Sequence, residues 1–147
     1  MFTIDTESYG KYVSAIYRHL QILLSAELAP YRIGSGQYLI LMAIAHKERI
    51  TQKALSEELL LDKTTITKAI AKLEAEGYVR REPDQADNRY NLLYLTEAGR
   101  DVVPKVKEAL NRVSDQSLVG INDDEYALML SSLKKVIGNM SELVRNG

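Results

Sequence analysis

Cysteine is absent from the sequence, and proline and glycine are scarce, with three and eight residues among 147. The absence of cysteine excludes disulfide bonds, thiolate zinc sites and thiol redox sensing. With so few helix-breaking residues, the chain is expected to be mostly helical. Apolar runs of membrane-spanning length are also absent, and the opening segment MFTIDTESYG has acids where a secretory signal has a basic start. We therefore expect a cytoplasmic protein with no membrane partner.

Net charge is nearly absent as well, at -1 for the whole chain, so no global excess of positive charge announces a nucleic-acid partner. The local distribution is uneven. Residues 63–81 carry five basic and two acidic side chains, whereas residues 82–99 carry one basic and four acidic side chains. A DNA-binding interpretation must therefore rest on geometry rather than on a basic patch.

Both ends of the chain carry apolar residues at alternating spacings of three and four, which predicts helices over 9–23 and 126–144. Further apolar residues beside these positions make each apolar helix face wider than one partner helix would cover. We expect these helices to pack on each other and on their copies in a homodimer, although a bundle within one chain is the alternative. The residues expected at the centre of the dimer are Val13, Ile16, Leu20, Leu133, Ile137 and Met140.

Three shorter helices are predicted between the ends, over 36–48, 51–61 and 63–76, with Ser35, Thr51 and Asp62 as their caps. After Gly77 the pattern changes to two strands, 78–83 and 89–95, joined by the turn sequence DQADN. Three helices followed by a hairpin are typical of a winged helix-turn-helix. The expected fold class is thus mainly α with a small two-stranded wing (α+β), followed by a long helix over 97–119.

The segment 63–76 has one apolar face and one small, polar and cationic face. Helical geometry turns Ile66, Ile70 and Leu73 towards the core, and Thr64 and Lys68 away from it. Such an outer face suits the major groove of DNA, where hydroxyls and lysines reach base edges and phosphates. The alternative is an outer face that is simply solvated.

The predicted hairpin tip carries Asp87 and Arg89. A guanidinium at this place suits the narrow minor groove beside the recognition helix, and Asp87 is expected to orient it through a bidentate ion pair. A loose surface ion pair is the alternative, and by itself it is the more common role for such a spacing.

The stretch DKTTITKAIAKLEAEGYVRREPDQADNRYNLLYLTEAG, residues 62–99, resembles the recognition helix and wing of the MarR family of transcription regulators. The family pattern runs from a capped helix through Leu-Glu-x-x-Gly-Tyr-Val to Asp-x-Arg and Leu-Thr-x-x-Gly. The matching residues are Leu73, Glu74, Gly77, Tyr78, Val79, Asp87, Arg89, Leu95, Thr96 and Gly99. The family's wing often holds a second arginine, where this chain has Asn88.

The resemblance implies a homodimeric repressor that binds a pseudo-palindromic operator in double-stranded DNA. Residues 1–32 and 100–147 would form the dimerisation region, and residues 33–99 the winged DNA-binding lobe. The family's DNA contacts are carried over to the matching positions of this sequence. The major-groove contacts then fall on the recognition helix, a phosphate contact lies further along the same helix, and a minor-groove contact lies in the wing. The predicted DNA-binding residues are Thr51, Lys63, Thr64, Thr65, Thr67, Lys68, Lys72 and Arg89.

Regulators resembling this chain are often released from DNA by a phenolic or aromatic anionic ligand. The residues expected around such a ligand are Tyr12, Tyr17, Arg18, Tyr31 and Tyr38. An arginine among tyrosines suits an aromatic anion, but tyrosines that merely pack the dimer interface are the more common case.

Other functional classes have weaker support. Some relatives bind zinc, which leaves a metal-responsive regulator as an alternative, but His19 and His46 show no metal-ligand spacing and no cofactor or metal site is predicted. No enzymatic motif is present, so the chain is not expected to be an enzyme. A winged helix that binds only proteins would predict an apolar or acidic outer face on 63–76, which Lys68 and Lys72 oppose.

Overall fold

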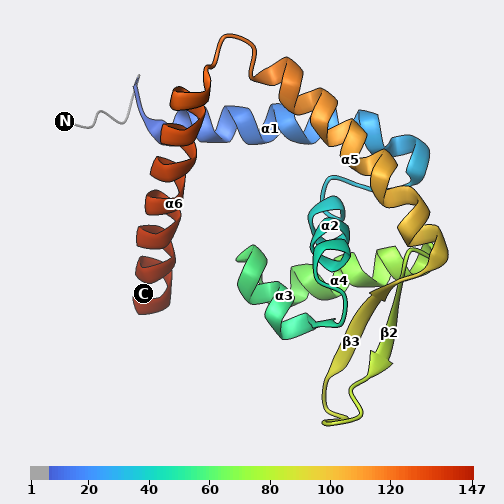
Figure 1. Ribbon diagram of the computed structural model, residues 1–147. Coiled ribbons are helices and arrows are strands. Elements are labelled where there is room, and N and C mark those ends of the chain that lie inside the picture. The colour runs from blue at the N-terminus through green and yellow to red at the C-terminus, as the bar shows by residue number, and fades with distance from the viewer. Residues whose placement is uncertain (1–6) are drawn as a thin grey trace. The chain divides into compact units, whose positions relative to one another are not determined.

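The computed structural model describes residues 7–147, which divide into two compact units at Val113 and Ser114 (Figure 1). The first unit holds α1 (Tyr9–Leu28), η1 (Ala29–Tyr31), α2 (Tyr38–His46), β1 (Ile50–Thr51), α3 (Gln52–Leu59), α4 (Lys63–Ala75), β2 (Val79–Pro83), β3 (Asn91–Leu95) and most of α5 (Glu97–Ser117). The second unit holds the end of α5 and α6 (Asp123–Asn146). None of the helices in the described part of the chain is long and apolar enough to cross a membrane.

The helix starts follow local capping chemistry. Thr51 accepts a hydrogen bond from the Ala54 N–H, Asp62 accepts one from the Thr65 N–H, and α6 begins with a complete capping box at Asn122. The predicted caps Thr51 and Asp62 are therefore confirmed. The predicted cap Ser35 is wrong.

Helix α2 begins after Gln37, and no side chain of the described residues caps its first turn. The Gln37 amide oxygen instead accepts a hydrogen bond from the Gly34 N–H at 2.8 Å. This bond belongs to the turn that precedes α2, where it satisfies a backbone donor outside the helix. A serine before an apolar helix was thus an insufficient signal for its start.

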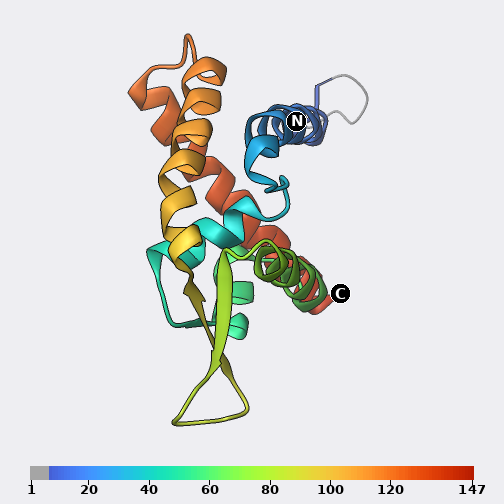
Figure 2. The ribbon, with the colours of Figure 1, turned by 90° about the vertical axis from the view of Figure 1, so that its right-hand side faces the viewer.

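The sheet has three antiparallel strands in the order β1-β3-β2. Strands β2 and β3 form the predicted hairpin, which extends beyond the helices of the lobe (Figure 2). Strand β1 was missed because a two-residue strand is too short to show alternating polarity. Its pairs Ile50↔Leu93 and Thr51↔Leu92 tie the start of α3 to the base of the wing.

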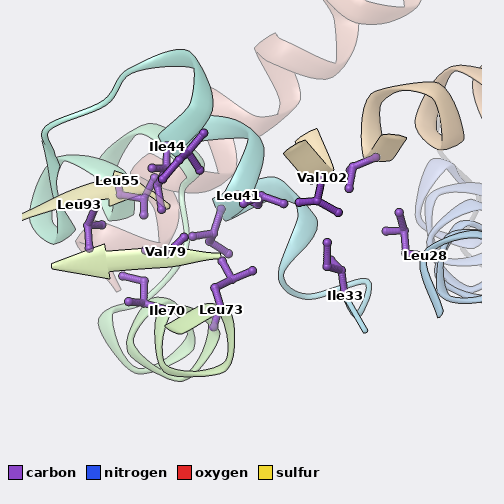
Figure 3. Close-up of a cluster of buried hydrophobic side chains, with 14 of the residues drawn as sticks. Leu28, Ile33, Leu41, Ile44, Leu55, Ile70, Leu73, Val79, Leu93 and Val102 are labelled. Atoms are coloured by element: carbon purple, nitrogen blue, oxygen red, sulfur yellow. The ribbon is translucent and has the colours of Figure 1, made fainter. Parts of the chain in front are cut away.

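A continuous apolar core lies beneath the helix-turn-helix (Figure 3). Ile70 and Leu73 from α4 meet Leu41 from α2 and Leu55 from α3, and Leu93 extends the same core under the wing. The predicted inward face of 63–76 is confirmed, because Ile66, Ala69, Ile70 and Leu73 are all buried. Burial of this face on one side leaves the opposite side of α4 in solvent.

The same core continues between α1 and α5. Leu24 and Leu28 of α1 are buried, as is the seam of α5 formed by Val102, Val106, Ala109 and Val113. An ion pair between Glu27 and Arg112, 3.0 Å apart, lies at this contact. The C-terminal half of α1 therefore packs within its own chain.

The N-terminal half of α1 and all of α6 leave apolar side chains exposed. Among the predicted dimer residues, Val13 and Ile16 are 46% and 61% exposed, whereas Leu20 is half-buried against the core of its own chain. No residue of α6 is buried. In α6 the other three predicted dimer residues, Leu133, Ile137 and Met140, are 39%, 44% and 44% exposed. The dimer interface and the predicted domain boundaries stay predictions.

Glycine at position 99 is required by a close approach at the start of α5. A Cβ added to Gly99 would lie 2.1 Å from the backbone oxygen of Tyr78, which itself accepts a hydrogen bond from the Thr96 N–H. We expect Gly99→Ala to lower the free energy of unfolding by about 2–3 kcal/mol, because backbone must move to relieve the contact. Gly36→Ala is the control, since nothing lies within 4 Å of its Cβ position. Equal urea midpoints for the two variants would contradict this packing.

Candidate nucleic-acid interface

The exposed side of α4 is the first component of the candidate interface. Thr64 and Lys68 lie one turn apart on the side opposite the buried residues, and both are exposed. Thr65 and Lys72 flank them and are also exposed. Between the two lysines Ala71 has only a methyl side chain, so a DNA duplex can approach the helix backbone closely there. The predicted outward face is thus present in the structure.

Asp62 shapes the start of this helix electrostatically. Its carboxylate accepts the Thr65 N–H hydrogen bond at 2.7 Å, which holds the pKa of Asp62 below its usual value, and the charge of Lys68 acts in the same direction. The capping carboxylate also offsets the positive end of the helix dipole. The positive charge of this face therefore comes from the lysine side chains more than from the helix terminus.

Thr67 has a different environment from the other threonines. Its hydroxyl donates to the Lys63 carbonyl at 2.7 Å and accepts from the Gln52 side-chain amide at 2.6 Å. The hydroxyl proton is thus used within the lobe, and the bond from Gln52 joins α3 to α4. This geometry favours a role for Thr67 in setting the angle of the two helices over its predicted contact with a base.

The wing tip carries the second component. Arg89 donates from Nε to Oδ1 of Asp87 at 3.0 Å and from Nη2 to Oδ2 at 2.7 Å, so the bidentate pair predicted from the sequence is confirmed. The pair lowers the pKa of Asp87 and raises the pKa of Arg89. The Arg89 side chain nevertheless remains 82% exposed. It is held in a fixed direction while its outer edge stays open to a ligand.

A cleft of about 480 Å³ lies between the start of α3 and the wing. Pairing of β1 with β3 brings its two walls together. Its lining residues are Thr51, Gln52, Lys53, Ser56, Glu57, Lys63, Arg89, Tyr90 and Asn91. Three of the predicted DNA-binding residues, Thr51, Lys63 and Arg89, therefore lie around one cleft. The hydroxyl of Thr51 caps α3, so its first role is structural.

Most of the residues that line the cleft were not predicted from the sequence. Lys53 and Tyr90 are the clearest omissions, because both are exposed and each lies within two residues of a predicted one, Thr51 and Arg89 respectively. Lys53 was detectable as a cation in the first turn of the predicted second helix. Tyr90 was detectable as the neighbour of Arg89, and its ring centroid lies 5.8 Å from that guanidinium.

The cations of the lobe fall into two groups by their partners. The wing arginines are paired: Arg80 with Glu82, Arg81 with Glu74 and Arg89 with Asp87. Among residues 7–147, the cleft and α4 lysines make no ion pair within 4.0 Å. These are Lys53, Lys63, Lys68 and Lys72. The lysines therefore supply charge that an anionic partner can neutralise, whereas the arginines are oriented by their own chain.

The predicted effector residues are partly brought together. Tyr38 is half-buried, and its burial raises its pKa, with a smaller contribution from Tyr17. The Tyr31 carbonyl accepts a hydrogen bond from the Tyr78 hydroxyl at 2.8 Å. Arg18 is exposed.

The remaining predicted tyrosine lies near the start of α1. The Tyr12 hydroxyl donates to Glu7 at 2.7 Å, and Tyr12 is exposed. None of the predicted effector residues lines the α3–wing cleft or the second cavity, which has about 370 Å³ and lies beside the wing. A ligand site among the tyrosines stays a prediction.

Comparison with known proteins identifies the family. The MarR family model matches residues 33–89, which include α2, α3, α4 and the wing up to Arg89. A MarR transcriptional regulator from Methanosarcina mazei is 34% identical with a TM-score of 0.80, covering 91% of this chain and 96% of its own.

Two further relatives connect the chain to regulation and to DNA. The SarZ transcriptional regulator of Staphylococcus haemolyticus is 35% identical over 102 residues, covering 69% of this chain and 68% of the relative. A mutant of MarR from Escherichia coli, solved in complex with operator DNA, is 27% identical with a TM-score of 0.77 and covers 86% of this chain and 91% of its own. The chain therefore belongs to the MarR family of transcription regulators, and its winged helix is a DNA-binding unit of that family.

Proposed function

We propose that this protein is a homodimeric repressor that binds a pseudo-palindromic operator and is released from it by a small aromatic anion. The observation that carries the DNA-binding geometry is a combination of two features: the lysines on α4, which make no ion pair with any described residue, and the exposed, oriented Arg89 across the cleft. In this arrangement Thr64 and Lys68 enter the major groove, Lys72 meets a phosphate, and Arg89 enters the adjacent minor groove.

The dimer is supported by the apolar surface that the described chain leaves uncovered. Helix α6 has no buried residue, yet Leu133, Ile137 and Met140 recur at its helical spacing. Val13 and Ile16 of α1 are exposed in the same way. A second copy that covers these faces would remove substantial apolar area from water, which favours a permanent dimer. Two recognition helices about 34 Å apart would then meet successive major grooves on one side of the duplex.

Repression follows if the operator overlaps a promoter, because a bound dimer excludes the transcription machinery. An operator can be selected from random duplexes by binding to the protein and placed over the promoter of a reporter gene. Expression of the reporter should then fall when the protein is supplied. Increased expression would indicate an activator instead.

Release by a ligand requires different ligand affinities in the DNA-bound and free arrangements of the lobes. Tyr38 and Tyr17, with the exposed Arg18 on the same helix as Tyr17, supply aromatic and cationic groups for an aromatic carboxylate. Benzoate is a suitable probe. It should weaken operator binding in the wild type and have a smaller effect on Arg18→Gln. Equal effects on both proteins would reject this site.

The DNA contact of α4 is tested by the salt dependence of binding. Each phosphate contact made by a lysine releases counterions, so the slope of log K against log salt should become less steep by about 0.9 for each contact removed in each lobe. We expect Lys72→Gln, which removes the proposed phosphate contact, to reduce the slope by about 2 for the dimer and to weaken binding to operator and unrelated duplexes alike. Lys134→Gln on α6 is the control and should leave the slope unchanged. A slope that Lys72→Gln does not alter would place the DNA elsewhere.

A further inference from the structure

One carboxylate lies among the cations of the α3–wing cleft. Glu57 lines this cleft together with Lys53, Lys63 and Arg89, and its side chain is exposed. Among the described residues 7–147, Glu57 makes no ion pair within 4.0 Å. It also follows Lys53 by four residues, which is the less favourable order for a pair within a helix. The carboxylate is thus not held in a direct ion pair with the cations of its own cleft, and it stays free to act on a partner's charge.

The position of the cleft decides what this charge would face. The first helix of a helix-turn-helix crosses the sugar-phosphate backbone, while the second enters the major groove. The DNA strand that separates the major groove entered by α4 from the minor groove entered by Arg89 must run past the start of α3. This step rests on the proposed function, and it places phosphates in front of the cleft that Glu57 lines.

We propose that Glu57 limits the affinity of the lobe for duplex DNA by holding a carboxylate against the phosphate backbone. The repulsion acts on phosphates and carries no sequence information. The repulsion therefore lowers the affinity for operator and for unrelated DNA by the same factor. The selectivity for the operator is unchanged, and the complex dissociates more easily. Lys53 and Lys63 hold the backbone at the same cleft, so Glu57 works against contacts that its own neighbours make.

The test is a comparison of Glu57→Gln with Glu58→Gln. The two residues are adjacent on α3, both are exposed, and only Glu57 lines the cleft. Each substitution removes one negative charge, so Glu58→Gln corrects for the change in net charge. The binding constants of wild type and both variants are measured on a selected operator and on a scrambled duplex, from about 0.05 to about 0.5 M monovalent salt. Thermal unfolding checks that all three proteins are folded alike.

We expect Glu57→Gln to bind both duplexes more tightly by the same factor, about three- to tenfold per dimer at the lowest salt. This factor should fall towards one as added salt screens the charges. Glu58→Gln should stay close to the wild type. Equal tightening by the two variants, or weaker or unchanged binding by Glu57→Gln, would overturn the assignment. A gain in affinity for the operator alone would also overturn the assignment, because it would mean that residue 57 contacts base edges and not phosphates. If none of the three proteins binds either duplex, the proposed function itself fails.

Discussion

Replacement of Ile137 by aspartate should convert the protein to a monomer and lower its affinity for operator DNA by about 10²- to 10⁴-fold. The dimer loss follows because a charge would have to be buried in an apolar interface without a partner. The affinity loss follows because two linked lobes bind through a high effective concentration that a single lobe lacks. Sedimentation equilibrium gives the mass, and a binding titration on the two-half-site operator gives the affinity.

Asn139→Asp is the matched control for this substitution. It places the same charge two residues further along α6, at an exposed polar position. It should leave both the mass and the operator affinity near the wild-type values. The dimer proposal fails if the wild type is monomeric at micromolar concentration, or if the Ile137→Asp variant still sediments as a dimer.

Removal of the Arg89 guanidinium from the wing should have the second large effect on operator affinity. Arg89→Ala should weaken operator binding by about tenfold to a hundredfold per lobe, because it removes the minor-groove contact and leaves the Asp87 carboxylate facing the DNA without its partner. The fold should not change, since Arg89 is exposed and its side-chain hydrogen bonds within residues 7–147 all go to Asp87 of the wing. The measurement is the operator dissociation constant at fixed salt.

Two companion variants separate the contributions to this effect. Arg89→Lys keeps the charge but loses the fork that matches the Asp87 carboxylate, so it should recover only part of the affinity. The double variant Asp87→Asn with Arg89→Ala should bind more tightly than Arg89→Ala alone, because the unpaired carboxylate is gone. If Arg89→Ala binds the operator as well as the wild type does, the wing does not contact the DNA.

Features governed by short-range chemistry could be predicted from the sequence. The caps Thr51 and Asp62 act on N–H groups three residues away, and the buried face of α4 follows from helical periodicity alone. The Asp87–Arg89 pair spans two residues of a tight turn. In each case the interacting groups are neighbours in sequence, so spacing defines geometry.

Features that depend on distant segments could not be predicted in the same way. The hydrogen bond from Gln52 to Thr67 spans 15 residues, and it changes the expected role of Thr67. The cleft forms only because β1 pairs with β3, more than 40 residues later in the chain. Likewise, the lysines of α4 and the arginines of the wing look equivalent in sequence. Only the fold pairs Arg81 with Glu74, whereas Lys68 and Lys72 make no ion pair within 4.0 Å in the described part of the chain.

Lysine reactivity tests directly whether the exposed side of α4 lies against DNA. The free protein and its operator complex are treated with an amine-acetylating reagent, and the extent of modification is measured at each lysine by mass spectrometry. We expect operator DNA to protect Lys68 and Lys72, whereas Lys134 and Lys135 on α6 should react equally in both samples. Equal modification of Lys68 and Lys72 with and without bound operator would contradict this expectation.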